Sequence, residues 1–409
     1  MLKPLEGVRV IDISHVIAGP LASFYLAQLG AEVIKIESPF GGDVMRASKS
    51  DGEVGDTPDG FVALNAGKRS FAVDFRQKEG ADLVRSLAVT ADVFIENFRP
   101  GVVARYGLDH ACVEKIKPDI VYCSISGFGQ QGKWSRRGAY DHVVQALTGM
   151  MMMQGSDADA PPLKVGFPVI DVAVGLMSAL AIVAAVHRRS RDGEGQYIDT
   201  SMVEASLMLM YPHASSFLTS RKEPQRVGNR GYTGSPTADT YRCCDGWLAL
   251  AANTPAQFRK LTEMLELQSV CEDAQALDLE AFNASGGGFV IAKDLAYLQS
   301  RFKTAFAERS AVDMEQRLNA VGVPCARVRR LGEFLDEMEQ GDDLDLPARC
   351  YSKNGEIVRT PGLGFRYRGD GTALRAAAPA LGADTQTLLE QLGMSSERIS
   401  ELVRARVIA

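Results

Sequence analysis

The spacing of apolar residues divides residues 1–130 into short strands and helices. Residues 8–14 (VRVIDIS) and 31–37 (AEVIKIE) have the pattern of strands, and residues 19–30 (GPLASFYLAQLG) have that of a helix that Gly30 ends. The alternation of strands and helices continues at residues 69–75, 79–91, 92–98 and 118–126. Repeated βα units predict an α/β fold with a doubly wound, mostly parallel sheet that is covered on both faces.

A continuous apolar run at residues 165–186 predicts a long helix, which basic residues and Gly193 end. The run is long enough to cross a bilayer, but Gly175, Ser178 and its many alanines favour a buried helix of a soluble protein. Asp171 is its only ionisable group. One interpretation is that Asp171 caps a helix beginning after residue 168, which stabilises a helix by ~1 kcal/mol.

The second half of the chain differs from the first in composition. Residues 221–242 are rich in Gly, Pro, Arg and Thr, which is typical of a linker or a binding loop. A second globular region follows from residue 246, with an amphipathic helix capped by Thr254. The pair Asn354-Gly355 predicts a β-hairpin. Further expectations are a flexible segment at residues 283–289, a helix and then a strand at 309–328, and two short helices joined at Gly393.

The composition is that of a soluble globular protein, because 46% of the 409 residues are apolar and 23% are charged. A net charge of -6 gives no electrostatic reason to expect nucleic acid or an anionic membrane as a partner. The seven cysteines form no CxxC pair and the five histidines no zinc pattern, so no metal is expected. Free thiols and an N-terminus unlike a signal peptide predict a cytoplasmic protein.

Several other kinds of site are weighed against the residues. Glu37 ends a strand where an acidic residue could meet a ribose hydroxyl, but the first turn lacks GxGxxG and Pro20 removes an N–H, which disfavours NAD. Cys243-Cys244 has no nearby histidine to support a nucleophile, and His15 is as compatible with a structural role as with a functional one. Basic residues near predicted strand ends form either a solvated rim or a site for an anionic ligand such as a phosphorylated nucleotide: Lys68, Arg69, Arg99, Arg105, Arg136 and Arg137.

Ordered segments along nearly the whole chain resemble one family, the class III CoA-transferases, a group that includes formyl-CoA transferase, carnitine CoA-transferases and α-methylacyl-CoA racemase. Each segment alone is a weak signal, and their order and spacing make the set specific. They are KPLEGVRVIDISHVIAGP, LGAEVIKIE, GGDVMR, NAGKRSFAVDF, ADVFIENFRPG, VYCSISGFGQQG, PVIDVAVGLMSALAIVAAVHRR, GEGQYIDTSMVEA and GVPCARV.

The resemblance implies that Asp171, in the PVID segment, is a covalent nucleophile. A carboxylate that attacks an acyl-CoA thioester gives a mixed anhydride and frees the CoA thiolate, which then forms an aspartyl-CoA thioester. Such an aspartate must be ionised and yet shielded from water, and an apolar helix N-terminus is expected to meet both demands.

Racemases of the same group are the nearest alternative, because they share the fold and the aspartate. They use a His-Asp pair shortly after the SGFGQ segment, and here Tyr140 stands where that histidine would be. His142, two positions later, is expected to project about 200° away around a helix. A tyrosine is what the transferases carry at this place, so Tyr140 is assigned to catalysis with Asp171, and a 2-methylacyl-CoA racemase remains the alternative.

The resemblance also implies a binding site for coenzyme A or acyl-CoA, as substrate and without a metal. Arg99 stands where formyl-CoA transferase has glycine, and Ser38-Pro39 replaces two arginines. That enzyme's run of four glycines over the nucleophile has no counterpart near residues 226–236, although GNRGYTG could substitute. The expected contacts are Ile17, Ala18, Val73, Arg76, Asn97, Phe98, Arg99, Arg105 and Asp141.

Family architecture implies a Rossmann-like large domain plus a smaller α+β domain in an interlocked homodimer. The expected parts are a large domain at residues 1–220, a small domain with linkers at 221–335 and a C-terminal segment at 336–409 that returns to the large domain. The expected reaction moves CoA from an acyl-CoA to a carboxylic acid. Arg46 or the arginine of VGNRGY is a candidate for binding a dicarboxylate such as succinate. A CoA-binding protein without turnover is the alternative from another class.

Overall fold

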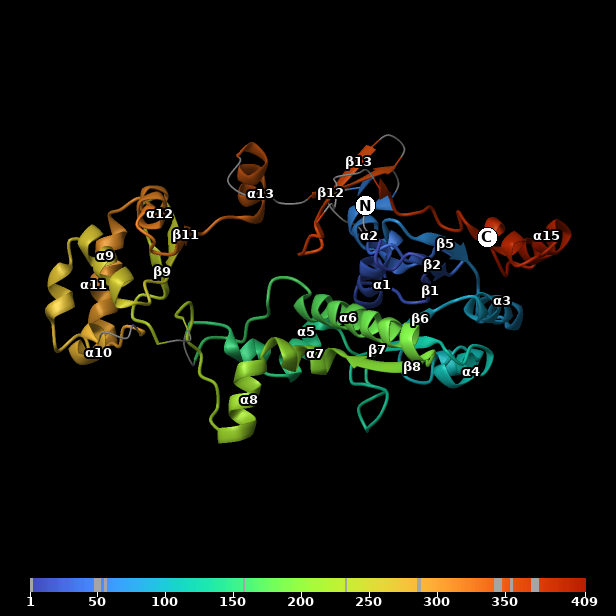
Figure 1. Cartoon of the computed structure of the whole chain (residues 1–409), viewed down its shortest axis with the longest axis horizontal. Helices are drawn as coiled ribbons and strands as arrows, with labels where there is room; N and C mark the ends of the chain where they lie inside the picture. Colours follow the sequence, from blue (N-terminus) through green and yellow to red (C-terminus); the bar gives the residue numbers. More distant parts are fainter. Residues whose placement is uncertain are drawn as a thin grey trace. The chain divides into compact units, whose positions relative to one another are not determined.

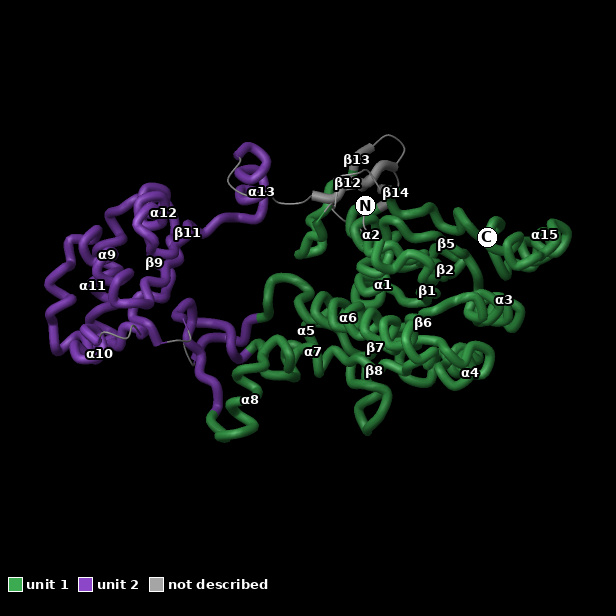
Figure 2. The backbone as a smooth tube through the Cα atoms, in the orientation of Figure 1, with its two compact units in different colours: residues 1–151, 164–222, 346–409 green, residues 152–163, 223–345 purple. Residues whose placement is uncertain are grey.

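The chain divides into two compact units (Figure 1, Figure 2). Unit 1 combines residues 1–151, 164–222 and 346–409, and unit 2 combines residues 152–163 and 223–345. The first unit therefore contains both ends of the chain. The computed structural model describes residues 3–47, 53–54, 57–156, 159–231, 234–284, 288–341, 348–353, 356–368 and 375–409.

A six-stranded sheet forms the centre of unit 1, and all its neighbouring strands are parallel. Strands β6 and β7 are buried at every residue, as expected of parallel strands covered on both faces. The prediction of a mostly parallel α/β sheet is confirmed. In spatial order the strands are β5 (Arg69–Ala72), β2 (Glu32–Glu37), β1 (Arg9–Asp12), β6 (Val93–Glu96), β7 (Val121–Ser126) and β8 (Gln196–Ser201).

Helices cover both faces of this sheet, because successive strand residues point to opposite faces. Val93 packs in one core with Ile182, whereas Phe94 packs in the other with Leu388 from near the C-terminus. The helices with Val93 are α1 (Ala18–Gln28), α6 (Val169–Asp192) and α7 (Met202–Leu209), and those with Phe94 are α3 (Lys78–Val89), α4 (His110–Ile116), α14 (Thr385–Gln391) and α15 (Ser396–Arg404).

Local signals place the helix ends as predicted. Gly30, just after α1, has φ +107°, and Gly193 ends α6 in the left-handed conformation at φ 74°. Helix α6 is long and apolar enough to cross a membrane, but Ile170, Val174 and Ile182 on it are buried in the core of unit 1. It packs against α1, β7 and β8.

Unit 2 has its own core around a three-stranded antiparallel sheet. Thr254 caps α9 in a capping box with Gln257, which confirms the predicted cap. The strands are β9 (Asp239–Arg242), β10 (Trp247–Leu250) and β11 (Cys325–Arg327), and the helices are α9 (Pro255–Met264), α10 (Leu279–Asn283), α11 (Leu295–Ala307), α12 (Ala311–Ala320) and α13 (Leu331–Gln340).

The predicted hairpin is present, because β12 (Ala348–Lys353) pairs antiparallel with β13 (Glu356–Pro361). Its turn, Asn354-Gly355, lies outside the described residues, as do Ser285, Gly286 and Gly287 of the expected flexible segment. The remaining elements are β3 (Glu53–Val54), β4 (Thr57–Pro58), β14 (Arg375–Ala376), α2 (Asp59–Asn65), α5 (Asp141–Leu147), α8 (Tyr211–Ser220) and short 3-10 helices at Val44–Ala47, Val103–Tyr106, Met150–Met153 and Gln268–Glu272.

Candidate active site

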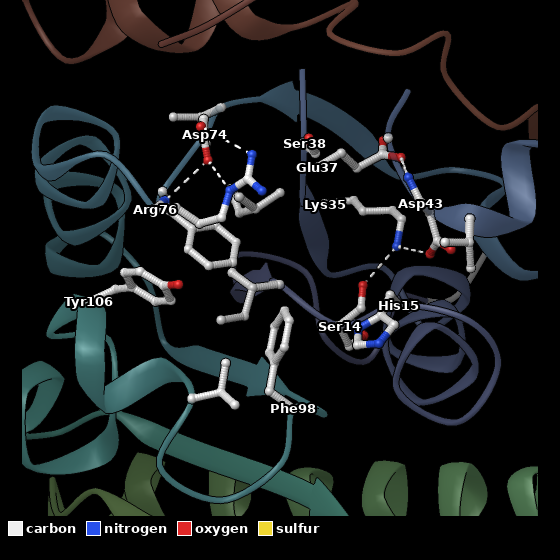
Figure 3. Close-up of a pocket in the computed structure, with 17 residues that line it drawn as sticks. Ser14, His15, Lys35, Glu37, Ser38, Asp43, Asp74, Arg76, Phe98 and Tyr106 are labelled. Atoms are coloured by element: carbon white, nitrogen blue, oxygen red, sulfur yellow. Dashed lines mark hydrogen bonds and ion pairs between the residues drawn. The ribbon is translucent and has the colours of Figure 1, made fainter. Parts of the chain in front are cut away.

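The ends of four parallel strands border a cavity of about 310 Å³ in unit 1 (Figure 3). Ser14 and His15 follow β1, Ser38 follows β2, Val73 follows β5 and Phe98 follows β6. Strand β1 lies between β2 and β6, so the strand order reverses direction beside it. A crevice at the carboxyl ends of strands at such a switch point is where open α/β sheets bind ligands.

The cavity has an apolar part and a charged part. Figure 3 shows Lys35, Glu37 and Asp43 grouped together, apart from Tyr106. This combination suits a ligand with a flat apolar ring and a few polar groups. The apolar lining consists of Ile13, Val73, Phe75, Phe98, Val102 and Tyr106.

The loop after β1 is held in a strained shape beside the cavity. Val16 has φ +69°, which is unfavourable for a β-branched residue, and its N–H donates to both oxygens of the Asp43 carboxylate at 3.3 and 3.2 Å. Asp43 pairs in turn with Lys35 at 3.0 Å. Asn97 joins this loop to the one after β6, because it accepts from the His15 N–H at 3.0 Å and donates to the His15 carbonyl at 2.8 Å.

Asp141, on α5, holds the first turn of α6. Its Oδ2 accepts hydrogen bonds from the N–H groups of Ile170 (2.7 Å) and Asp171 (3.2 Å), and its Oδ1 accepts from Gln145 Nε2 at 2.5 Å. The interpretation of Asp171 as an N-cap is therefore wrong. The helix begins at Val169, and Asp141 supplies the capping oxygen from another element, which leaves the Asp171 side chain outside this role.

The Asp171 carboxyl is half-buried and close to a second carboxylate. Burial first, and the charge of Asp141 second, together raise its pKa from 3.8 to about 6. At neutral pH the group is still ionised, and it is poorly stabilised as an anion. Such a carboxylate has the reactivity that a nucleophile needs.

Helix α6 also meets the loop after β1. A Cβ atom added to Gly175, one turn after Asp171, would lie 2.8 Å from the Ala18 carbonyl oxygen and 3.2 Å from Leu21. Because glycine leaves this space open, the N-terminus of α1 approaches α6 closely. Ala18, the first residue of α1, contacts the helix of Asp171 in this way, whereas neither Ala18 nor Ile17 lines the cavity.

Tyr140 precedes α5 in an extended conformation, with its side chain 69% exposed. Its ring lies parallel to that of His142, with 6.4 Å between the ring centres. The expectation that these two side chains project in different directions is therefore wrong, because Tyr140 lies before the helix and the helical rotation does not apply to it.

The predicted CoA contacts are only partly brought together. Val73, Arg76 and Phe98 line the cavity, with the Arg76 guanidinium paired to Asp74 at 2.7 Å. Arg99 and Arg105 are absent from its lining, and Arg99 borders a second cavity instead. Asn97 and Asp141 are engaged with protein groups, as described above.

Comparison with known proteins decides the family. The sequence matches CoA-transferase family III over residues 5–385. The chain belongs to this family. It is 40% identical over 276 residues to succinate--glutarate CoA-transferase of Agrobacterium fabrum, covering 66% of this chain and 68% of that one. It is 30% identical over 394 residues to succinyl-CoA:glutarate CoA-transferase of Mus musculus, covering 96% and 87%.

The fold of this CoA-transferase is also known from a solved structure. A CAIB/BAIF family protein from Brucella suis superposes with a TM-score of 0.79 at 30% sequence identity, covering 96% of this chain and all of that chain. The resemblance predicted from the ordered segments is confirmed, and the protein is an enzyme that acts on CoA thioesters.

Two sequence-based candidates for ligand binding in the transferase are wrong. Arg46 donates to Glu37 through Nε and Nη2, at 2.8 and 2.7 Å, and stacks on Phe61, so it is not available to bind a second carboxylate. Lys68 has a fully buried side chain paired with Asp12 at 3.2 Å, so it forms no part of a basic rim.

Arg69, the neighbour of Lys68 in the expected basic rim, is likewise engaged, with Glu32 and Asp384. In unit 2, burial raises the pKa of the Cys243 thiol to about 11, which keeps it protonated and argues against a nucleophile.

Sequence reasoning left the role of His15 open and missed several other residues of the cavity. His15 and Tyr106 line it, and burial lowers the pKa of His15, so its imidazole is neutral at physiological pH. Lys35 and Asp43 support the loop that carries His15. A lysine inside the apolar strand AEVIKIE was the available signal, since a lysine that is buried on a covered strand needs a partner.

Proposed function

We propose that this enzyme transfers CoA from an acyl-CoA donor to a carboxylic acid through an aspartyl-CoA thioester on Asp171. The observation that supports this most is the Asp171 carboxyl itself, which is half-buried, has a pKa of about 6 and lies at the start of α6, one turn before the contact with Ala18. Its relatives include enzymes named for CoA transfer between succinate and glutarate.

The steps balance without a net proton change. The Asp171 carboxylate attacks the thioester carbonyl, and the CoA thiolate leaves as an acyl-aspartyl anhydride forms. The thiolate then attacks the aspartyl carbonyl, and the donor acid departs with the bridging oxygen. The acceptor carboxylate attacks the aspartyl thioester, the thiolate leaves again, and its attack on the acceptor acyl carbon regenerates Asp171 as a carboxylate.

Burial of the carboxyl serves both halves of this reaction. A poorly hydrated carboxylate is a stronger nucleophile, and exclusion of water protects the anhydride from hydrolysis. The exposed Tyr140 hydroxyl is proposed to hydrogen bond to the thioester oxygen as negative charge develops there. Tyr140→Phe is then expected to lower kcat more than it raises KM.

Mass spectrometry of the full-length enzyme tests the intermediate. Incubation with succinyl-CoA, followed by hydroxylamine, is expected to modify the peptide that contains Asp171 in the native enzyme and not in Asp171→Asn. A native enzyme that turns over without acquiring this modification contradicts the mechanism. Inversion at the α-carbon of a 2-methylacyl-CoA without exchange of CoA would instead support a racemase.

The proposed acceptor is a dicarboxylate such as glutarate or succinate, by analogy with the substrates named for the relatives. With succinyl-CoA as donor, KM for glutarate is expected to be at least about tenfold lower than KM for butyrate, because a second carboxylate adds a charge-assisted contact. Equal KM values for the two acids would contradict a dicarboxylate acceptor. The arginine of VGNRGY, Arg230, is exposed, and its role stays a prediction.

A homodimer, interlocked as the family resemblance implies, is proposed as the working assembly. In unit 1, apolar side chains of α6, α7 and α8 remain exposed, including Leu180 at 71%, Leu218 at 68% and Met208 at 52%. Exposed apolar surface on this scale is typical of a protein interface. Light scattering of the purified enzyme tests the dimer, and a stable monomer would contradict it.

A further inference from the structure

A second cavity, of about 290 Å³, lies next to the first in unit 1. The segment from Phe98 to Tyr106 separates them. Phe98, Val102 and Tyr106 line the first cavity, whereas residues 99, 101, 103 and 104 line the second. The two cavities therefore share one wall, which consists of a turn and a short 3-10 helix.

Two buried polar atoms that border this second cavity lack partners. Asp109 Oδ1 and Gln130 Nε2 have no hydrogen-bond partner in the described part of the chain and are shielded from solvent. Leaving such atoms unpaired is unfavourable, and more so for a charged group. Asp109 Oδ1 is an acceptor without a donor, so a ligand in the cavity that donates a hydrogen bond would satisfy it.

A second carboxyl group borders the same space. Glu96, at the end of β6, is 2% exposed, and its Oε2 accepts from the Phe98 N–H at 2.8 Å. Burial, with a smaller contribution from the charge of Asp199, raises its pKa to about 7. Arg99 also lines the cavity, and its guanidinium lies against Gly138, which is not a lining residue and where an added Cβ would be 2.8 Å from Nη2.

Aromatic rings complete the lining. His110 packs on Tyr197 with 4.6 Å between ring centres and meets Tyr122 edge-on at 5.6 Å. Aromatic faces beside carboxylates attract organic cations. A metal ion is a poorer match, because no group of three or more His, Cys, Asp or Glu side chains able to hold one occurs within the described ranges.

We propose that this second cavity is a binding site for a small organic cation with a primary ammonium group. The ammonium donates to Asp109 Oδ1 and faces Glu96, and its carbon chain packs on Tyr197 and His110. Its volume is at the lower end of the range for ligand pockets, which limits the ligand to a few carbon atoms.

Occupancy of the second cavity affects the first through their common wall. A ligand that fixes Arg99, Val103 and Ala104 also restricts Phe98 and Tyr106, whose rings border the first cavity. Binding at the two cavities is then coupled, and the coupling is reciprocal. This coupling rests on the proposed CoA site, whereas ammonium binding does not.

Isothermal titration of the full-length protein with n-butylammonium chloride tests the site, with n-butanol as the neutral probe. Native protein is expected to bind n-butylammonium saturably and at least about tenfold more tightly than n-butanol, because the alcohol can donate to Asp109 but lacks the positive charge that strengthens this hydrogen bond. Asp109→Asn is expected to weaken n-butylammonium at least about tenfold. The control is Glu401→Gln, an exposed carboxylate on α15 that does not line the cavity, and this variant is expected to bind as the native protein does.

Equal affinity for the two probes in the native protein overturns the proposal, and this comparison needs no variant to fold. Equal n-butylammonium binding by Asp109→Asn and Glu401→Gln overturns it as well. Asp171→Asn is expected to retain binding, which separates the site from catalysis. A failure of the aspartyl-CoA mechanism would leave these results unchanged, so the two proposals can fail independently.

Discussion

Asp171→Asn is expected to stabilise the protein at neutral pH while abolishing CoA transfer. The Asp171 carboxyl has a pKa of about 6 in the folded chain, compared with an ordinary value of 3.8. The fold therefore favours the protonated acid, and ionisation of the buried group costs free energy. Above about pH 6 the rise of about two pKa units lowers the free energy of unfolding of the native protein by ~3 kcal/mol. The asparagine variant does not ionise and avoids this loss.

The pH dependence isolates this effect from other consequences of the substitution. Because the folded pKa lies above the unfolded one, the favourable contribution is complete below about pH 4 and declines as pH rises through 6. The stability advantage of the asparagine variant is expected to grow by about 1.4 kcal/mol between about pH 5 and about pH 8. An amide and a protonated carboxyl have similar shapes, and the amide does not ionise. Any other effect of the substitution on the free energy of unfolding therefore does not depend on pH.

Urea unfolding of both proteins at several pH values measures this change, followed by a probe in unit 1. The exposed Asp336→Asn, on α13, is the matched control and is expected to show no such growth. If the difference in the free energy of unfolding between Asp171→Asn and the native protein stays constant with pH, the reasoning is refuted. A variant that is less stable than the native protein at about pH 8 would refute it as well.

Three further changes probe the surroundings of the nucleophile. Asp141→Asn removes a charge that raises the pKa of the nucleophile, so the acidic limb of the kcat/KM profile is expected to move to lower pH, and an unmoved limb would contradict this. Gly175→Ala places a methyl group 2.8 Å from the Ala18 carbonyl and is expected to raise KM for acyl-CoA several-fold in steady-state kinetics. Lys68→Met leaves Asp12 buried without its partner and is expected to lower the free energy of unfolding by roughly 3–5 kcal/mol, with part recovered by a second change to Asn at position 12.

Elements with local signals could be predicted from the sequence. The ends of α1 and α6 follow from Gly30 and Gly193, and the cap of α9 follows from Thr254, because each depends on residues within one turn. The parallel sheet followed from repeated βα units. The added helix α8 was missed, since Pro212 lies in its first turn, where a proline can begin a helix or end one.

The site was harder to predict because its geometry depends on contacts between distant segments. Asp171 could be assigned through the family resemblance, but the residue that caps its helix lies 30 positions earlier. Arg99 was expected beside Phe98 in one cavity, and the two side chains point to different cavities because the chain turns there. Whether two adjacent residues face the same cavity depends on the backbone conformation between them, and the sequence alone does not determine that conformation here.

The buried ion pairs beneath the loop after β1 have a geometric role. Lys35 with Asp43, and Lys68 with Asp12, have side chains at most 1% exposed, and such pairs add little net stability because each charge loses its hydration. They do, however, fix the directions of several hydrogen bonds at once. Asp43 holds the strained Val16, and Lys68 also donates to the Pro20 carbonyl at 2.9 Å. These bonds set the path of the chain at the start of α1, and the loop is therefore shaped before any ligand arrives, which reduces the entropy that binding must overcome.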